Sequence, residues 1–91
     1  MRKLTVLAVT AAMLGAATLA QAGSLGRTCT SAPENQWLTI GALQSKVEAL
    51  GYKVQKAKLK NACGEMYAID KTGGKVELFV DPTNAAIIGQ M

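Results

Sequence analysis

The chain has 91 residues, with 10 basic and 6 acidic side chains and no histidine. Arg2 and Lys3 supply two of the positive charges, and the remaining excess is too small to indicate nucleic acid binding. The lack of histidine removes the commonest general base and the commonest metal ligand. We therefore expect no catalytic residues, no cofactor and no metal ion.

The first 22 residues have the layout of a cleaved secretory signal. Arg2 and Lys3 precede an uncharged run over 4–20, and Ala20-Gln21-Ala22 offers the small residues that signal peptidase needs. We expect cleavage after Ala22, a periplasmic or secreted mature protein, and no stable membrane insertion afterwards. An uncleaved anchor is the alternative, but the run is weakly hydrophobic for a bilayer span.

Residues 23–36 are rich in Gly, Ser, Thr and Pro and show no apolar period, which predicts an extended lead-in. Its role is to bring Cys29 to a single domain over residues 37–91. The two cysteines of a small exported domain predict a disulfide between Cys29 and Cys63. Closing a loop of about 35 residues stabilises a domain by roughly 3–4 kcal/mol in the chain-entropy model. Two free thiols are the alternative, but the pair lacks Cys-x-x-Cys spacing.

One amphipathic helix is predicted from Ile40 to Leu50. Thr39 can cap its first turn, and Leu38 and Leu43 stand at the positions of a hydrophobic staple. Gly51 can end the helix because glycine adopts positive φ. The apolar stripe has spacings of three and four residues: Ile40, Leu43, Val47 and Leu50.

After Gly51 the apolar period changes from that of a helix to that of a strand. The alternation slips near Gln55-Lys56, which predicts a β-bulge in the first strand. Further strands are expected over 65–70, 75–81 and, at the edge, 85–89, with turns at 61–64 and 71–74. Pro82 ends the third strand because it has no N–H to donate. The predicted fold is α+β, with the helix across one face of a three- to four-stranded antiparallel meander.

The two faces of this sheet are expected to differ. The helix should cover Val54, Met66, Ala68, Val76, Leu78 and Val80. The opposite face, which bears Glu65, Tyr67, Ile69, Glu77 and Phe79, should remain open. Exposed aromatic and aliphatic side chains favour a partner surface at Tyr67, Ile69 and Phe79, with simple cross-strand packing as the alternative. An open face would not desolvate Glu65 and Glu77, so the pair does not predict catalysis.

Two other features have a functional and a structural interpretation. Lys53, Lys56, Lys58 and Lys60 form either a patch for anionic partners or a solvated edge that resists strand addition, and the edge is favoured. Trp37 is interpreted as a cover over one end of the core rather than a ligand clamp.

The run GYKVQKAKLKNACGEMYAIDKTGGKVELFVDP, residues 51–82, and the run CTSAPENQW, residues 29–37, resemble the PepSY domain in its small exported form. PepSY domains occur in the propeptides of thermolysin-like metallopeptidases. The resemblance implies a non-catalytic binding or regulatory module that inhibits or modulates a peptidase, with a peptidase or another envelope protein as partner. A structural or small-ligand-binding envelope protein without a protease partner is the alternative.

The chain departs from the family pattern at two places. After the turn at Asp81 and Pro82, a candidate docking hairpin, Asn84 stands near the family's Thr-Gly pair and is expected to take the glycine's left-handed conformation. Gly64 stands where the family often has an aromatic residue.

Overall fold

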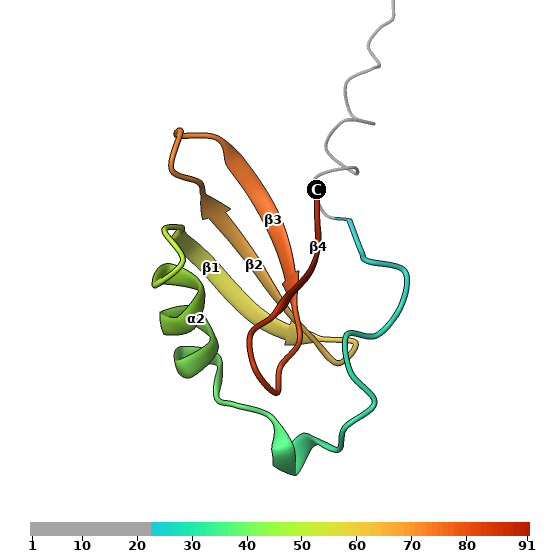
Figure 1. The fold of residues 1–91 in the computed structure, drawn as a ribbon. Coiled ribbons are helices and arrows are strands. Elements are labelled where there is room, and N and C mark those ends of the chain that lie inside the picture. Colours follow the sequence, from blue (N-terminus) through green and yellow to red (C-terminus); the bar gives the residue numbers. More distant parts are fainter. Residues whose placement is uncertain (1–22) are drawn as a thin grey trace, which may run out of the picture.

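The computed structural model describes residues 23–91, so the predicted signal segment and its cleavage after Ala22 lie outside the described residues. Its strands form one antiparallel sheet in the order β1-β2-β3-β4, and α2 packs on one face (Figure 1). The α+β prediction is confirmed. The elements are η2 Glu34–Gln36, α2 Ile40–Glu48, β1 Lys53–Lys60, β2 Cys63–Ile69, β3 Lys75–Val80 and β4 Ile87–Gln90.

The helix begins as predicted but ends earlier. The Thr39 hydroxyl accepts a hydrogen bond from the Ala42 N–H at 3.1 Å, which confirms the cap. The helix stops at Glu48, and Gly51 then adopts φ +107°. Leu50 is therefore 54% exposed instead of completing the apolar stripe. Its predicted place in the core is wrong because the chain has already left the helix.

The predicted bulge is confirmed by a register shift between Val54 and Lys56 in the pairing of β1 with β2. The following turn is tighter than expected. Asn61 and Ala62 both have positive φ, 54° and 58°, as two-residue hairpin turns require. Cys63 and Gly64, expected in the turn, therefore already belong to β2.

The turn between β3 and β4 differs from the prediction. Ala85, not Asn84, adopts positive φ, at 65°. The Asn84 side chain instead accepts a hydrogen bond from the Ala86 N–H at 2.8 Å, while the Ala85 methyl packs into the core at 5% exposure. Because the turn extends to Ala86, β4 begins at Ile87 rather than Ala85.

The main core lies between α2 and the sheet, as predicted. Gly64 allows the layers to approach, since a Cβ there would lie 2.7 Å from Val80 Cγ2 and 3.4 Å from Leu43 Cδ1. The departure from the family at Gly64 is thus explained by close packing. Val54 and Val76 are partly buried against this core. Its buried members are Leu43, Val47, Met66, Ala68, Leu78, Val80 and Ala85.

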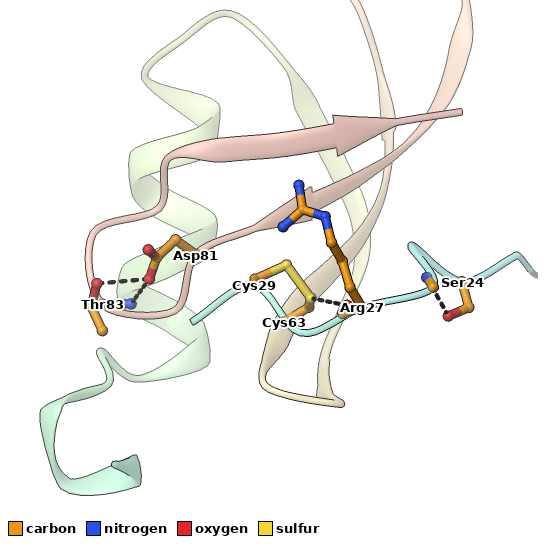
Figure 2. Close-up of a disulfide and its surroundings, with 7 residues drawn as sticks. Ser24, Arg27, Cys29, Cys63, Asp81 and Thr83 are labelled. Carbon is orange, nitrogen blue, oxygen red and sulfur yellow. Dashed lines mark hydrogen bonds between the residues drawn. A yellow bond between two sulfur atoms is a disulfide. The ribbon is translucent and has the colours of Figure 1, made fainter. Parts of the chain in front are cut away.

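A second, smaller cluster lies on the face away from α2, called the back face below. Cys29 and Cys63 form the predicted disulfide, and the Cys29 N–H donates to the Ala62 carbonyl at 3.3 Å. The disulfide fixes the lead-in, residues 23–36, beside the end of the sheet where β1 turns into β2 (Figures 1 and 2). Leu25, Phe79 and Ile88 complete the cluster.

Candidate functional site

The back face is not open along its whole length. Phe79 is fully buried, so its predicted role as an exposed anchor is wrong. The disulfide, Ile88 and Leu25 of the lead-in surround it. Leu25 sits so close to β4 that a Cβ at Gly89 would lie 2.5 Å from Leu25 Cδ1. We call the part of the back face around Cys63, Phe79 and Ile88 the covered half.

Tyr67, Ile69 and Glu77 form what we call the open half. Tyr67 pairs with Glu77 across β2 and β3, and Ile69 pairs with Lys75. Tyr67 and Ile69 are half-buried and belong to neither apolar cluster. The structure therefore brings two of the three predicted surface residues together and separates them from Phe79.

A hollow of about 600 Å³ borders the open half and is lined by Gln55, Tyr67, Lys75, Glu77 and Met91. Ala68 and Val76 also line it, although both pack with the core on the α2 side of the sheet. Met91 exchanges two backbone hydrogen bonds with Glu77, at 2.8 and 3.0 Å, so the two side chains share a face. The sequence placed Tyr67 and Glu77 on this face and Ala68 and Val76 on the face covered by the helix, but Gln55, Lys75 and Met91 were not predicted as lining residues. Lys75 could have been assigned to this face, because it lies two residues before Glu77 in the same strand. Gln55 could not, because it lies in the β-bulge, where the alternation of side chains is interrupted.

Both glutamates of the back face are buried, with 4% exposure for Glu65 and for Glu77. Burial raises the pKa of Glu77, and the Glu65 carboxylate raises it further; Lys58, the Tyr67 hydroxyl and Lys60 act in the opposite direction. The pKa of Tyr67 is also raised, by burial and by the two carboxylates. The expectation that this face gives no desolvation is wrong.

The two glutamates differ in their partners. Lys58 Nζ lies 4.0 Å from Glu65 Oε1. Neither carboxylate oxygen of Glu77 accepts a hydrogen bond of good geometry; the nearby Tyr67 hydroxyl favours its charged form without completing such a bond. The four lysines of β1 are exposed along the edge strand, and both interpretations of this lysine run remain predictions.

The turn at Asp81 and Pro82 has a structural role. The Asp81 carboxylate accepts hydrogen bonds from the Thr83 N–H at 2.8 Å and the Thr83 hydroxyl at 2.7 Å (Figure 2). Pro82 is buried, and its carbonyl accepts from the Leu38 N–H at 2.8 Å. The bond from Leu38 joins the turn to the segment that enters α2, and the bonds from Thr83 close the turn on itself, so its main polar groups are already engaged.

Trp37 is half-buried, and its indole N–H donates to the Ala32 carbonyl at 3.0 Å. It is not among the residues that pack against the main core. The indole therefore stabilises the lead-in rather than covering one end of the core.

Across residues 23–91, no three His, Cys, Asp or Glu side chains are grouped so that they could hold a metal ion. No helix in the same range is long and apolar enough to cross a membrane.

The family described as peptidase propeptide and YPEB domain matches residues 6–91. The chain belongs to this PepSY family. Searches of curated proteins and of solved structures found no match. PepSY domains are generally non-catalytic, propeptide-like modules, and the predicted family resemblance is confirmed.

Proposed function

We propose that this PepSY protein is an exported, non-catalytic module that binds a peptidase through the open half of the back face and modulates its activity. The observation that supports it most is the match to a peptidase propeptide family over residues 6–91. A propeptide acts by binding its enzyme, so the property transferred to this chain is recognition of a peptidase surface.

Export is part of the proposal. The Cys29–Cys63 disulfide suits an oxidising compartment such as the bacterial periplasm or the cell exterior. The charged start, apolar run and Ala-Gln-Ala site of residues 1–22 favour the same compartment.

The open half suits a partner better than the other surfaces do. α2 covers the front of the sheet, and the lead-in covers the disulfide end of the back face. Tyr67 and Ile69 remain half-buried beside a hollow of about 600 Å³. Here the sheet presents an aromatic and an aliphatic side chain next to a pocket. Hot spots of protein interfaces have this arrangement of anchor residues beside pockets.

The hollow also favours a second candidate function, the binding of a small molecule. Its volume of about 600 Å³ lies within the range of small-molecule sites, roughly 300–1,000 Å³. In that case the protein would bind its ligand in the same place but without a peptidase partner.

Titration of the mature chain, residues 23–91, into exported thermolysin-like metallopeptidases would test the proposal. We expect the chain to change the rate of peptide hydrolysis. The Ile69→Asp variant should bind roughly 5–30-fold more weakly, because loss of an anchor costs about 1–2 kcal/mol. Leu50→Asp is the matched control, since Leu50 is 54% exposed in the turn after α2 and does not line the hollow. Equal effects of the two variants, or no effect on any such peptidase, would contradict the proposal.

A further inference from the structure

Glu77 is an unusual group to find on the floor of a binding face. It is 4% exposed, lines the hollow over the open half, and has no hydrogen-bond partner for either carboxylate oxygen. A buried carboxylate without a partner is costly and is relieved by a proton or by a cation that brings hydrogen-bond donors. Among the described residues, no positive group is therefore paired directly with Glu77.

The cations of the described chain do not meet this need. Lys58 forms its ion pair with Glu65; Lys58 and Lys60 act on Glu77 through their charge alone, without an ion pair. Lys75 shares the face of Glu77 but is exposed and forms no ion pair with it. Arg27, the one arginine among residues 23–91, is also exposed and forms no ion pair with either glutamate.

The shape of the site favours a guanidinium. Two unpartnered carboxylate oxygens match the two parallel N–H groups of an arginine fork. Tyr67 lies directly across from Glu77, and a guanidinium stacks on an aromatic ring at little cost in hydration. Met91, 53% exposed beside Glu77, is unbranched and can rotate aside to admit the ligand.

We propose that the hollow over the open half receives an arginine side chain of the partner protein, with Glu77 as its carboxylate acceptor and Tyr67 stacked against its guanidinium. The inference rests on the proposed function, because it names the group by which the partner is anchored. The raised pKa of Glu77 agrees with it, since burial and Glu65 already favour neutralisation of this carboxylate.

Titrations with short peptides test the site without the peptidase. The probe is acetyl-Ala-Arg-Ala-amide, followed by amide chemical shifts of the labelled mature chain. The neutral control replaces arginine by citrulline, and the anionic control replaces it by glutamate. We expect the arginine peptide alone to shift the signals of Tyr67, Glu77 and Met91. A stronger response to the glutamate peptide would show that the lysines decide the ligand, and would overturn the proposal.

Substitutions then distinguish the contribution of the Glu77 carboxylate to peptide binding from the contribution of the shape of the hollow. Glu77→Gln should weaken binding of the arginine peptide by roughly tenfold or more, because a hydrogen bond between charged groups is lost. Glu48→Gln, on an exposed residue of α2, should change nothing. Met91→Ala should keep the preference for arginine over citrulline. Loss of that preference in Met91→Ala, or equal binding by Glu77→Gln and the native chain, would contradict the inference.

The peptide titrations test the arginine site, and the peptidase assay tests the proposed partner, so a negative result in one does not decide the other. If the peptidase responds to the native chain but the arginine peptide does not bind, only the arginine site is wrong. If the arginine peptide binds but no thermolysin-like peptidase responds, the proposed enzyme partner is wrong and the site stands.

Discussion

The two halves of the back face are built on the same strands and the same alternation, yet they have opposite surroundings. Around Phe79 the lead-in, Ile88 and the disulfide form a closed apolar cluster. Around Tyr67 and Glu77 no apolar cluster forms, and a hollow of about 600 Å³ remains. The alternation of side chains along a strand predicts which face each side chain occupies. It does not predict which other segment of the chain covers that face.

This difference separates structure from recognition. The covered half gives a small domain a second apolar cluster and a covalent closure, which are the means by which short chains gain stability. The open half keeps a buried carboxylate and a half-buried tyrosine that contribute little to packing. Residues of the covered half should therefore affect unfolding, and residues of the open half should affect binding.

The largest expected effect is on the covered half. Phe79→Ala should cost about 3–5 kcal/mol of unfolding free energy, as for other fully buried aromatic residues. Ile69→Ala, at the half-buried end of β2, should cost clearly less. Urea denaturation of the two variants would check this, and equal costs would show that the two halves are packed alike.

Removal of the Cys29–Cys63 disulfide should have the second largest effect. Cys29→Ser combined with Cys63→Ser should cost roughly 3–4 kcal/mol, mainly because the unfolded chain regains loop entropy. For a domain of this size a loss of about 3 kcal/mol lowers Tm by roughly 12–24 °C. Hydrogen exchange should also show lower protection in β4 near Ile88 than in β2 near Tyr67. Thermal melts with unchanged Tm would contradict the role of the lead-in.

Glu77 should give the open half a distinct pH dependence. Because its pKa is raised in the folded protein, the folded state binds more protons than the unfolded state between the usual glutamate pKa and the raised value. Stability should therefore fall as the pH rises through that window, and Glu77→Gln should lack this component. Glu65, Lys58, Lys60 and Tyr67 face the same carboxylate and remain in both proteins.

The control for this experiment is Asp70, whose pKa is lowered by hydrogen bonds from Thr72 and Gly74. Its contribution should be present at neutral pH and lost as the pH falls through the lowered pKa, equally in both proteins. Melting curves recorded between the acidic and neutral range would separate the two effects. Parallel profiles for the native chain and Glu77→Gln would show that Glu77 titrates normally.

The smallest effect concerns the hairpin that borders the covered half. Ala62 adopts φ 58° in a two-residue turn, where glycine is preferred. Ala62→Gly should stabilise the protein by about 0.5–1 kcal/mol, because relief of the left-handed strain exceeds the added entropy of the unfolded chain. Ala85→Gly is the matched case: φ is also positive, at 65°, but the buried methyl is lost. Its net change should be near zero by equilibrium denaturation.

Much of the fold could be predicted from single residues. Thr39 and Gly51 indicated the ends of the helix, and the slip in alternation near Gln55 indicated the bulge. Cys29 and Cys63 indicated the disulfide. Each of these residues has one dominant local consequence. The last turn could not be predicted so well. Asn84 has a stronger left-handed preference than Ala85, but its side chain is used to cap Ala86, and burial of Ala85 decides the geometry.

The candidate site was predicted only in part. The alternation of side chains along β2 and β3 places Tyr67, Ile69 and Glu77 on the back face. The burial of Phe79 could not be predicted in this way, because it depends on the lead-in, whose sequence has no regular apolar pattern. The desolvation of Glu65 and Glu77 could not be predicted either, since it follows from the tertiary surroundings of the sheet. Met91 enters the site because the pairing of β3 with β4 continues past Gln90 to the hydrogen-bonded pair of Glu77 and Met91.

The central claim is that recognition belongs to the open half alone. Chemical-shift mapping of the labelled mature chain in complex with a responsive metallopeptidase tests it most directly. The account predicts that perturbed amides gather at Tyr67, Ile69, Lys75, Glu77 and Met91, while those of α2 and of the lead-in stay unchanged. Perturbations centred on α2, or on the lead-in around Leu25 and Cys29, would contradict it.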